Sequence, residues 1–119
     1  MIIDSSPLIE LDRGGKKLLL LIREAMRRDE PIVTSHGVLA QVFRDPAQQA
    51  RLSRVVSAGD IVVRPIDDGR AVGVALALSN TSDVVDGSVA LLALANDDVV
   101  LTSDRGDFTK FDGVRVVDF

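Results

Sequence analysis

The chain has 119 residues, of which 46% are hydrophobic and 27% charged, a composition typical of one folded domain and not of a disordered chain. It has no cysteine, which excludes disulfides, thiolate nucleophiles and cysteine-bound zinc, and its single histidine excludes a multi-histidine metal site. The net charge of −4 is uneven: residues 1–54 hold nine Lys/Arg against seven Asp/Glu, and residues 55–119 hold five against eleven. The chemistry is therefore limited to carboxylates, hydroxyls, amides and basic side chains.

No segment has the character of a leader or a membrane anchor. An acid stands at position 4 with no basic stretch before an apolar run, so we do not expect a signal peptide. The longest apolar run, residues 18–22, is far below the ~20 residues that cross a bilayer. We expect a cytoplasmic protein without a membrane partner.

In the first half of the chain, short apolar segments alternate with helical patterns. A strand at residues 1–4 is followed by a short helix that Ser6 caps and Pro7 begins, and that stops by residues 14–15. Residues 16–28 predict a second helix with a wide apolar face, and residues 31–34 a second strand. Ser35 is expected to cap a third helix reaching Arg44, and Asp45 with Pro46 to begin a fourth that reaches residue 57.

The second half repeats the alternation. Residues 61–66 predict a strand, and Asp67 is expected to cap a helix through residue 78 that two glycines weaken. A buried helix is expected at residues 83–96, strands at 98–103 and 114–118, and one helical turn at 107–111. Strands separated by helices require a parallel sheet covered on both faces. We therefore predict one α/β domain over residues 1–119, with a parallel sheet of about four to five strands flanked by helices.

Aspartates recur where such a sheet binds ligands, beyond the carboxyl ends of its strands. Asp4 ends the first predicted strand and Asp104 follows the fourth. Asp83 and Asp86 open the helix that leads into that strand, and Asp107 comes three residues after Asp104. Each of the last four also has an ordinary explanation, since aspartate is favoured in the first turn of a helix and in tight turns. Their common position favours a shared site.

Several carboxylates close together raise one another's pKa unless a cation is present. An all-oxygen set of ligands suits Mg²⁺ or Mn²⁺. Such an ion can deprotonate water and stabilise charge on a phosphoryl oxygen. Phosphodiester hydrolysis is therefore the expected class of reaction.

Three segments, in order, resemble the PIN-domain family, and in particular the VapC-type toxins of toxin–antitoxin pairs. They are the opening stretch Ile2 to Ile9 with Asp4 and Ser6, the helix that begins at Asp86, and the stretch Val100 to Phe108 with Asp104. The final strand, residues 113–117, extends the resemblance over nearly the whole chain.

The resemblance implies a Mg²⁺- or Mn²⁺-dependent endoribonuclease whose metal is held by three or four acids. Asp4, Asp86 and Asp104 match the metal-binding positions, and Asp107 is a nearby alternative for the last of them. Ser6 and Thr102 match supporting hydroxyls that orient carboxylates or water. The family also implies a homodimer held inactive by an antitoxin protein.

One position departs from the family pattern. Where many of these toxins have a glutamate on the third helix, this chain has Gln41, which carries no charge but can accept a hydrogen bond from a metal-bound water. We expect Asp83 to supply the missing fourth carboxylate. Arg44, expected on the same helical face as Gln41, is a candidate contact for the RNA phosphate, and an ordinary surface arginine is the equal alternative.

Gln41 also supports a rival interpretation of another class. A PIN-like domain can retain the fold and bind RNA or a protein with little cleavage. Metal binding distinguishes the two, because a genuine site should raise the melting temperature with Mn²⁺.

Overall fold

Five parallel strands form one sheet in the computed structural model, which describes residues 1–119. Their spatial order is β3-β2-β1-β4-β5, so the first strand is central. The strands are short and agree with the predicted segments: β1 (Ile2–Ile3), β2 (Val33–Ser35), β3 (Val62–Arg64), β4 (Val99–Thr102) and β5 (Arg115–Asp118). The predicted fold class is confirmed.

The central position of β1 fixes where a ligand can bind. The chain builds β2 and β3 on one side of β1, then crosses to the other side for β4 and β5. Such a reversal leaves a crevice beyond the carboxyl ends of the two strands that flank it. Here these strands are β1 and β4, which are followed directly by Asp4 and by Ser103 and Asp104.

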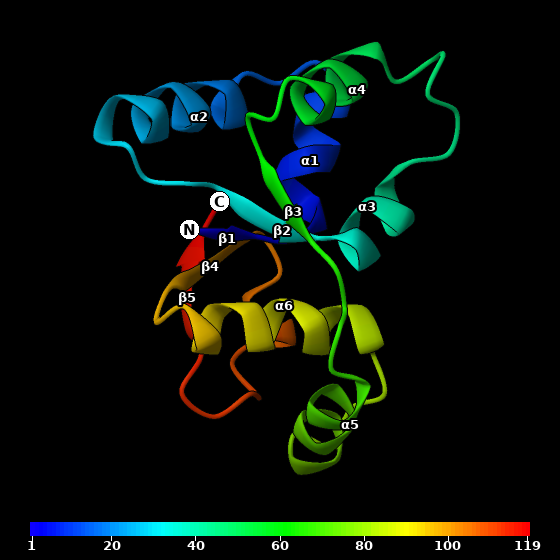
Figure 1. Ribbon diagram of the computed structural model, residues 1–119, viewed down its shortest axis with the longest axis vertical. Coiled ribbons are helices and arrows are strands. Elements are labelled where there is room, and N and C mark those ends of the chain that lie inside the picture. Colours follow the sequence, from blue (N-terminus) through cyan, green and yellow to red (C-terminus); the bar gives the residue numbers. More distant parts are fainter.

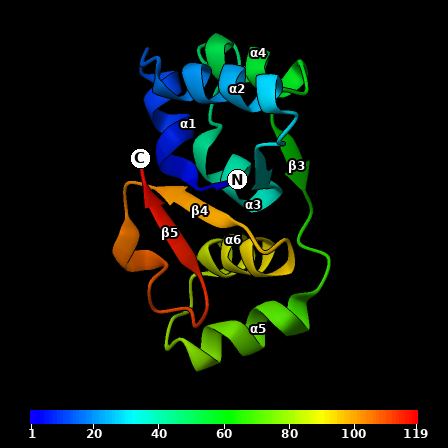
Figure 2. The ribbon, with the colours of Figure 1, turned by 90° about the vertical axis from the view of Figure 1, so that its left-hand side faces the viewer.

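Helices cover both faces of the sheet (Figure 1). On one side lie α1, α2 and α4, on the other lie α6 and then α5, and α3 follows the end of β2; Figure 2 shows the same layers from the side. The helical segments are α1 (Ser5–Asp12), α2 (Lys17–Arg28), α3 (His36–Val42), α4 (Ala50–Ser57), α5 (Gly69–Leu78), α6 (Val84–Ala95) and the short 3-10 helix η1 (Arg105–Asp107). None of them is both long and apolar enough to cross a bilayer.

The core explains how a strand of two residues can anchor the fold. Ile2 and Ile3 are completely buried, as a central parallel strand covered on both faces requires. They belong to one continuous cluster of 21 buried hydrophobic residues that includes Leu8 of α1, Val89 of α6 and Val100 of β4. The sheet edge that carries the aspartates is therefore held by a single packed core.

The starts of α4 and α5 differ from the prediction. The predicted fourth helix begins only at Ala50, because the Asp45 carboxylate caps a turn by accepting from the Ala47 N–H at 3.1 Å. In α5 the capping side chain is that of Asp68, which accepts from the Ala71 N–H at 3.0 Å, and Asp67 lies one residue outside. At both places a proline and an aspartate indicate that the chain turns. They do not fix where the helix starts, because an aspartate side chain caps a turn and a helix in the same way.

Candidate metal centre

Asp4 is buried at the end of β1 although it carries a carboxylate. Its residue is only 3% exposed, and its Oδ2 accepts a hydrogen bond of 3.1 Å from the Thr102 hydroxyl. Thr102 is completely buried at the end of β4, and its Oγ1 in turn accepts from the Asp104 N–H at 3.0 Å. The threonine predicted as a supporting hydroxyl thus connects the first predicted ligand with the backbone of the third.

Ser6 has a different role from the predicted cap. The helix α1 begins at Ser5 with Asp4 at the N-cap, and the Asp4 side chain makes no capping bond. Ser6 therefore lies inside the first turn, where its hydroxyl accepts from the Ser103 N–H at 2.8 Å and lies 3.5 Å from Thr102 Oγ1. The prediction of Ser6 as N-cap is wrong, but its position beside Thr102 fits a supporting hydroxyl.

Asp86 is the second buried carboxylate. It lies in the first turn of α6, is 8% exposed, and its backbone N–H donates to Asp83 Oδ1 at 2.9 Å. Asp83 is thus the N-cap of α6, and one of its oxygens is engaged by the helix. Its capping role was one of the two interpretations that the sequence left open.

Asp104 precedes η1, Asp107 is its last residue, and both are exposed. The cation between them, Arg105, does not neutralise them, because its guanidinium donates to Asp118 at 2.9 Å and to the Val116 carbonyl at 3.2 Å. The two aspartates therefore remain without an ion-pair partner beside the buried pair.

The electrostatics show which carboxylates influence one another. Burial raises the pKa of Asp4, the Ser5 N–H and the Thr102 hydroxyl oppose this, and the charges of Asp104 and Asp107 raise it further. Burial also raises the pKa of Asp86, and the charges of Asp83, Asp107 and Asp4 raise it further, to about 7. Asp107 acts on both buried carboxylates. The five predicted acids are therefore brought to one region.

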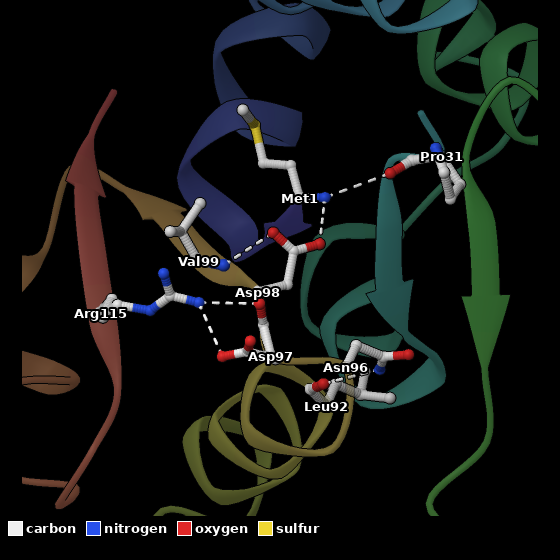
Figure 3. A network of polar contacts seen from close by, with 8 residues as sticks. All are labelled: Met1, Pro31, Leu92, Asn96, Asp97, Asp98, Val99 and Arg115. Carbon is white, nitrogen blue, oxygen red and sulfur yellow. Dashed lines mark hydrogen bonds and ion pairs between the residues drawn. The ribbon is translucent and has the colours of Figure 1, made fainter. Parts of the chain in front are cut away.

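The opposite edge of the sheet provides a contrast (Figure 3). There the Asp98 carboxylate is paired with the α-amino group of Met1, which also donates to the Pro31 carbonyl at 3.2 Å. Asp97 is paired with Arg115 at 3.1 Å. None of the five aspartates at the carboxyl edge has such a pair.

The donor chemistry of this cluster fits a hard divalent cation. Carboxylate and hydroxyl oxygens are the preferred ligands of Mg²⁺ and Mn²⁺, and two buried carboxylates without a cation are unfavourable. No three acidic side chains, however, lie close enough together to form a preassembled metal-binding group. Asp104 and Asp107 are exposed, so they are the members of the cluster whose side chains have room to reorient.

Gln41 and Arg44 differ from expectation in one respect. Gln41 is exposed on the last turn of α3, but this helix ends at Val42 and Phe43 has an extended backbone. Arg44 therefore does not share a helical face with Gln41, and that prediction is wrong. Its guanidinium donates to the carbonyls of Ala40 and Phe43 at 2.8 and 2.7 Å, which satisfies acceptors at the end of the helix.

Lys110 is a further residue of the site, and no sequence motif points to it. Among the causes that set the pKa of Asp86, the Lys110 ammonium is the only one that lowers it, so this lysine is the cation nearest in effect to the cluster. Its sequence indication is weak: it stands three residues after Asp107, outside any of the motifs.

No protein-family model matches the chain, and no curated protein matches it. Solved structures do. The crystal structure of PAE2754 from Pyrobaculum aerophilum aligns with a TM-score of 0.68 and 19% identity, over 98% of this chain and 82% of that one. FitAcB from Neisseria gonorrhoeae aligns with a TM-score of 0.61 and 18% identity, over 97% of this chain and 94% of that one. FitAB bound to an IR36 DNA fragment gives 0.62 and 18%, over 99% and 94%.

The chain has a PIN-like fold. At 18–19% identity the likeness extends to the path of the backbone and not to the chemistry of individual residues. The PIN-like fold accounts for the strand order and for the position of the crevice. The roles of the aspartates have to be argued from their own surroundings.

Proposed function

We propose that the protein is a Mg²⁺- or Mn²⁺-dependent endoribonuclease and the toxin component of a toxin–antitoxin pair. The observation that supports this most is the pair of buried carboxylates, Asp4 and Asp86, beside three further aspartates and without any ion-pair partner. A divalent cation removes the cost of gathering these charges, and the PIN-like fold puts them at the crevice where ligands of such sheets bind.

Asp4, Asp86 and Asp104 are the proposed metal ligands. When bound, the metal would supply a nucleophilic water and stabilise charge on the phosphoryl oxygens. Thr102 holds the Asp4 carboxylate in place through its 3.1 Å hydrogen bond, and Ser6 fixes the turn after β4 through the Ser103 N–H. The buried position of Asp4 and Asp86 keeps competing water away from the carboxylates.

A ribonuclease assay tests the proposal directly. Cleavage of single-stranded RNA is expected with Mg²⁺ or Mn²⁺ and absent with EDTA. Asp4→Asn and Asp86→Asn are each expected to reduce the rate by at least about 100-fold, more than the loss of a group that only orients a ligand. Asp97→Asn is the matched control, because it removes one aspartate charge at the opposite edge of the sheet. Cleavage that survives EDTA, or both site variants, would contradict the proposal.

The fourth carboxylate is a choice between Asp83 and Asp107. Asp107 acts on both buried carboxylates, whereas Asp83 acts on Asp86 and already caps α6. We therefore expect Asp107→Asn to weaken Mn²⁺ binding more than Asp83→Asn, in which the asparagine still caps the helix. The reverse order, measured by calorimetric Mn²⁺ titration, would assign the position to Asp83.

The toxin role and the partners rest on the resemblance to VapC-type toxins. Expression of the chain alone is expected to arrest growth of a host cell, and Asp86→Asn to abolish the arrest. An antitoxin encoded by a neighbouring short reading frame is expected to restore growth when co-expressed. The proposed homodimer is measured by light scattering of the purified protein. Growth arrest that Asp86→Asn leaves unchanged would separate toxicity from the carboxylate site.

Gln41 and the absence of a preassembled group of three acids favour a second candidate, a PIN-like module that binds RNA or protein without cleaving it. This candidate predicts RNA binding that neither metal nor Asp86→Asn alters, together with no cleavage. The assay above distinguishes the two, since only the nuclease loses activity with EDTA.

A further inference from the structure

A hollow of about 370 Å³ lies between α2 and α4, away from the carboxylates. Four basic side chains surround it: Lys16, Arg23, Arg51 and Arg54. Its walls also include apolar side chains, among them Leu11 and Leu19, and no acidic residue. These four cations and this hollow are called the basic basin below.

The cations of the basic basin are exposed and have no ion-pair partner. Nearby cations differ in this respect, because Arg27 and Arg28 pair with Glu24 and Lys17 lies over the Phe119 ring. Four like charges around one hollow repel each other unless an anion joins them. The basic basin therefore has the character of an anion-binding site.

The nearest acids along the chain do not cancel this charge. Glu10 Oε1 accepts from the Lys17 N–H at 3.3 Å, and Asp12 Oδ2 accepts from Gln49 Nε2 at 3.1 Å. Both carboxylates are thus turned to neighbours outside the basic basin, and neither lines the hollow.

The helix α1 connects the basic basin with the carboxylates. It begins directly after Asp4 and ends two residues before the first of the glycines that precede Lys16, and Figures 1 and 2 show it leading from the sheet to the layer of α2 and α4. A second hollow lies beside it, lined by Ser6, Ile9, Glu10, Arg13, Gly15 and Ser103. The eight residues of α1 span ~12 Å. That length corresponds to roughly three or four nucleotides of a stacked strand.

We propose that the basic basin binds the phosphates of the RNA strand whose scissile bond lies at the carboxylates. The inference rests on the proposed ribonuclease function, and it adds the direction in which the RNA strand leaves the carboxylate site. Arginine guanidinium groups bind phosphate oxygens in a bidentate manner, and the apolar walls accept ribose and base faces. An acidic protein segment is the competing ligand class. RNA is favoured because α1 has the carboxylate site at its N-terminal end and the basic basin at its C-terminal end, so that one strand can reach both.

Binding is measured without cleavage, so that the result does not depend on the nuclease. The Asp86→Asn protein in EDTA is titrated with a labelled single-stranded RNA long enough to reach from the carboxylates to the basic basin. We compare Arg51→Gln/Arg54→Gln with Arg70→Gln/Arg115→Gln, which removes the same charge from α5 and β5. The basin variant is expected to lose about tenfold in affinity or more, and its salt slope to fall by about 0.7 per lost phosphate contact. The control is expected to change little.

A cleavage assay then distinguishes a failure of the basin proposal from a failure of the nuclease proposal. In a protein that retains Asp86, the two basin substitutions are expected to raise KM for the long RNA and to leave cleavage of a dinucleotide unaltered. RNA binding that depends on the basic basin without any cleavage would contradict the nuclease and support the basin. Equal affinities of basin and control variants for RNA would overturn the basin proposal whatever the nuclease does. A basin variant that loses affinity for polyglutamate but keeps its affinity for RNA would also overturn the basin proposal.

Discussion

At the scale of single residues, the central feature is Asp86, whose surroundings favour the protonated carboxyl over the charged carboxylate. Burial and three neighbouring acids raise the pKa of Asp86 to about 7, against an ordinary value of 3.8. The unfolded chain therefore loses this proton at lower pH than the folded one. As pH rises from about 4 through 7, the unfolded state binds fewer protons than the folded state, and metal-free stability falls.

Asp86→Asn is expected to remove that loss, because the amide cannot ionise. At 1.4 kcal/mol for each pKa unit, the gain in the free energy of unfolding at pH 8 is at most about 4 kcal/mol, and it vanishes near pH 4. Thermal denaturation of both proteins in EDTA across this range measures it. Parallel pH profiles of the two proteins would mean that Asp86 ionises normally in the folded chain.

Thr102 provides a second test at this scale. Thr102→Val keeps the shape of a completely buried side chain but removes the hydroxyl that donates to Asp4 and accepts from the Asp104 N–H. We expect a 10–100-fold loss of Mn²⁺ affinity, the usual effect of removing a group that orients a ligand. Thr109→Val, at an exposed position between η1 and β5, is the control and should bind Mn²⁺ normally.

At the scale of elements, α5 and α6 approach each other at Gly87. A Cβ at this position would lie 2.9 Å from Leu76 Cδ2 and 3.2 Å from Val72 Cγ1, so Gly87→Ala must displace side chains of α5. We expect a cost of about 1 kcal/mol, and some displacement of the Asp86 carboxylate next to it. Gly73→Ala is the matched control: it lies inside α5 with open space around it and should stabilise by about 0.5–1 kcal/mol. Urea denaturation measures both, and equal signs for the two variants would contradict the close approach.

The elements also show what the sequence could predict. The alternation of apolar segments and helical patterns was sufficient for the five strands and six α-helices, and for a parallel sheet with the aspartates at one edge. The helical turn predicted at residues 107–111 lies earlier, at Arg105–Asp107. Helix boundaries were harder, because one residue type serves several purposes. Ser6 and Pro7 have the chemistry of a helix start, yet α1 starts before them and the Ser6 hydroxyl faces Ser103 instead. Arg44 was misplaced since nothing local indicates that α3 ends at Val42.

The site was predictable to the same degree. Asp4 and Asp86 could be named because strand ends and helix starts are visible in the sequence. Their burial, and the engagement of Arg105 by Asp118, depend on contacts with β4 and β5 that no local pattern contains. The basic basin likewise brings residue 16 next to residue 54 through the packing of separate helices.

At the scale of the whole molecule, charge is separated. Five unpaired aspartates gather at the carboxyl edge of the sheet, four unpaired cations gather between α2 and α4, and α1 leads from one cluster to the other. A divalent metal should therefore act on stability as well as on chemistry, since it neutralises the acidic end. At a Mn²⁺ concentration of 100 times its Kd, mass action alone adds about 2.7 kcal/mol. For a domain of this size the melting temperature should rise by roughly 10 °C.

This stabilisation and that of Asp86→Asn both remove the cost of a buried, charged Asp86 carboxylate among other acids, so they should not add. At pH 8 the variant is expected to melt higher than the metal-free wild type and then to show little further rise with Mn²⁺, because it lacks both the repulsive charge and a ligand. Asp97→Asn should retain the full Mn²⁺ shift, since its charge lies at the paired, opposite edge. If the Asp86→Asn protein showed the full further rise in melting temperature with Mn²⁺, the metal would bind elsewhere. The buried aspartates would then only lower the stability of the fold.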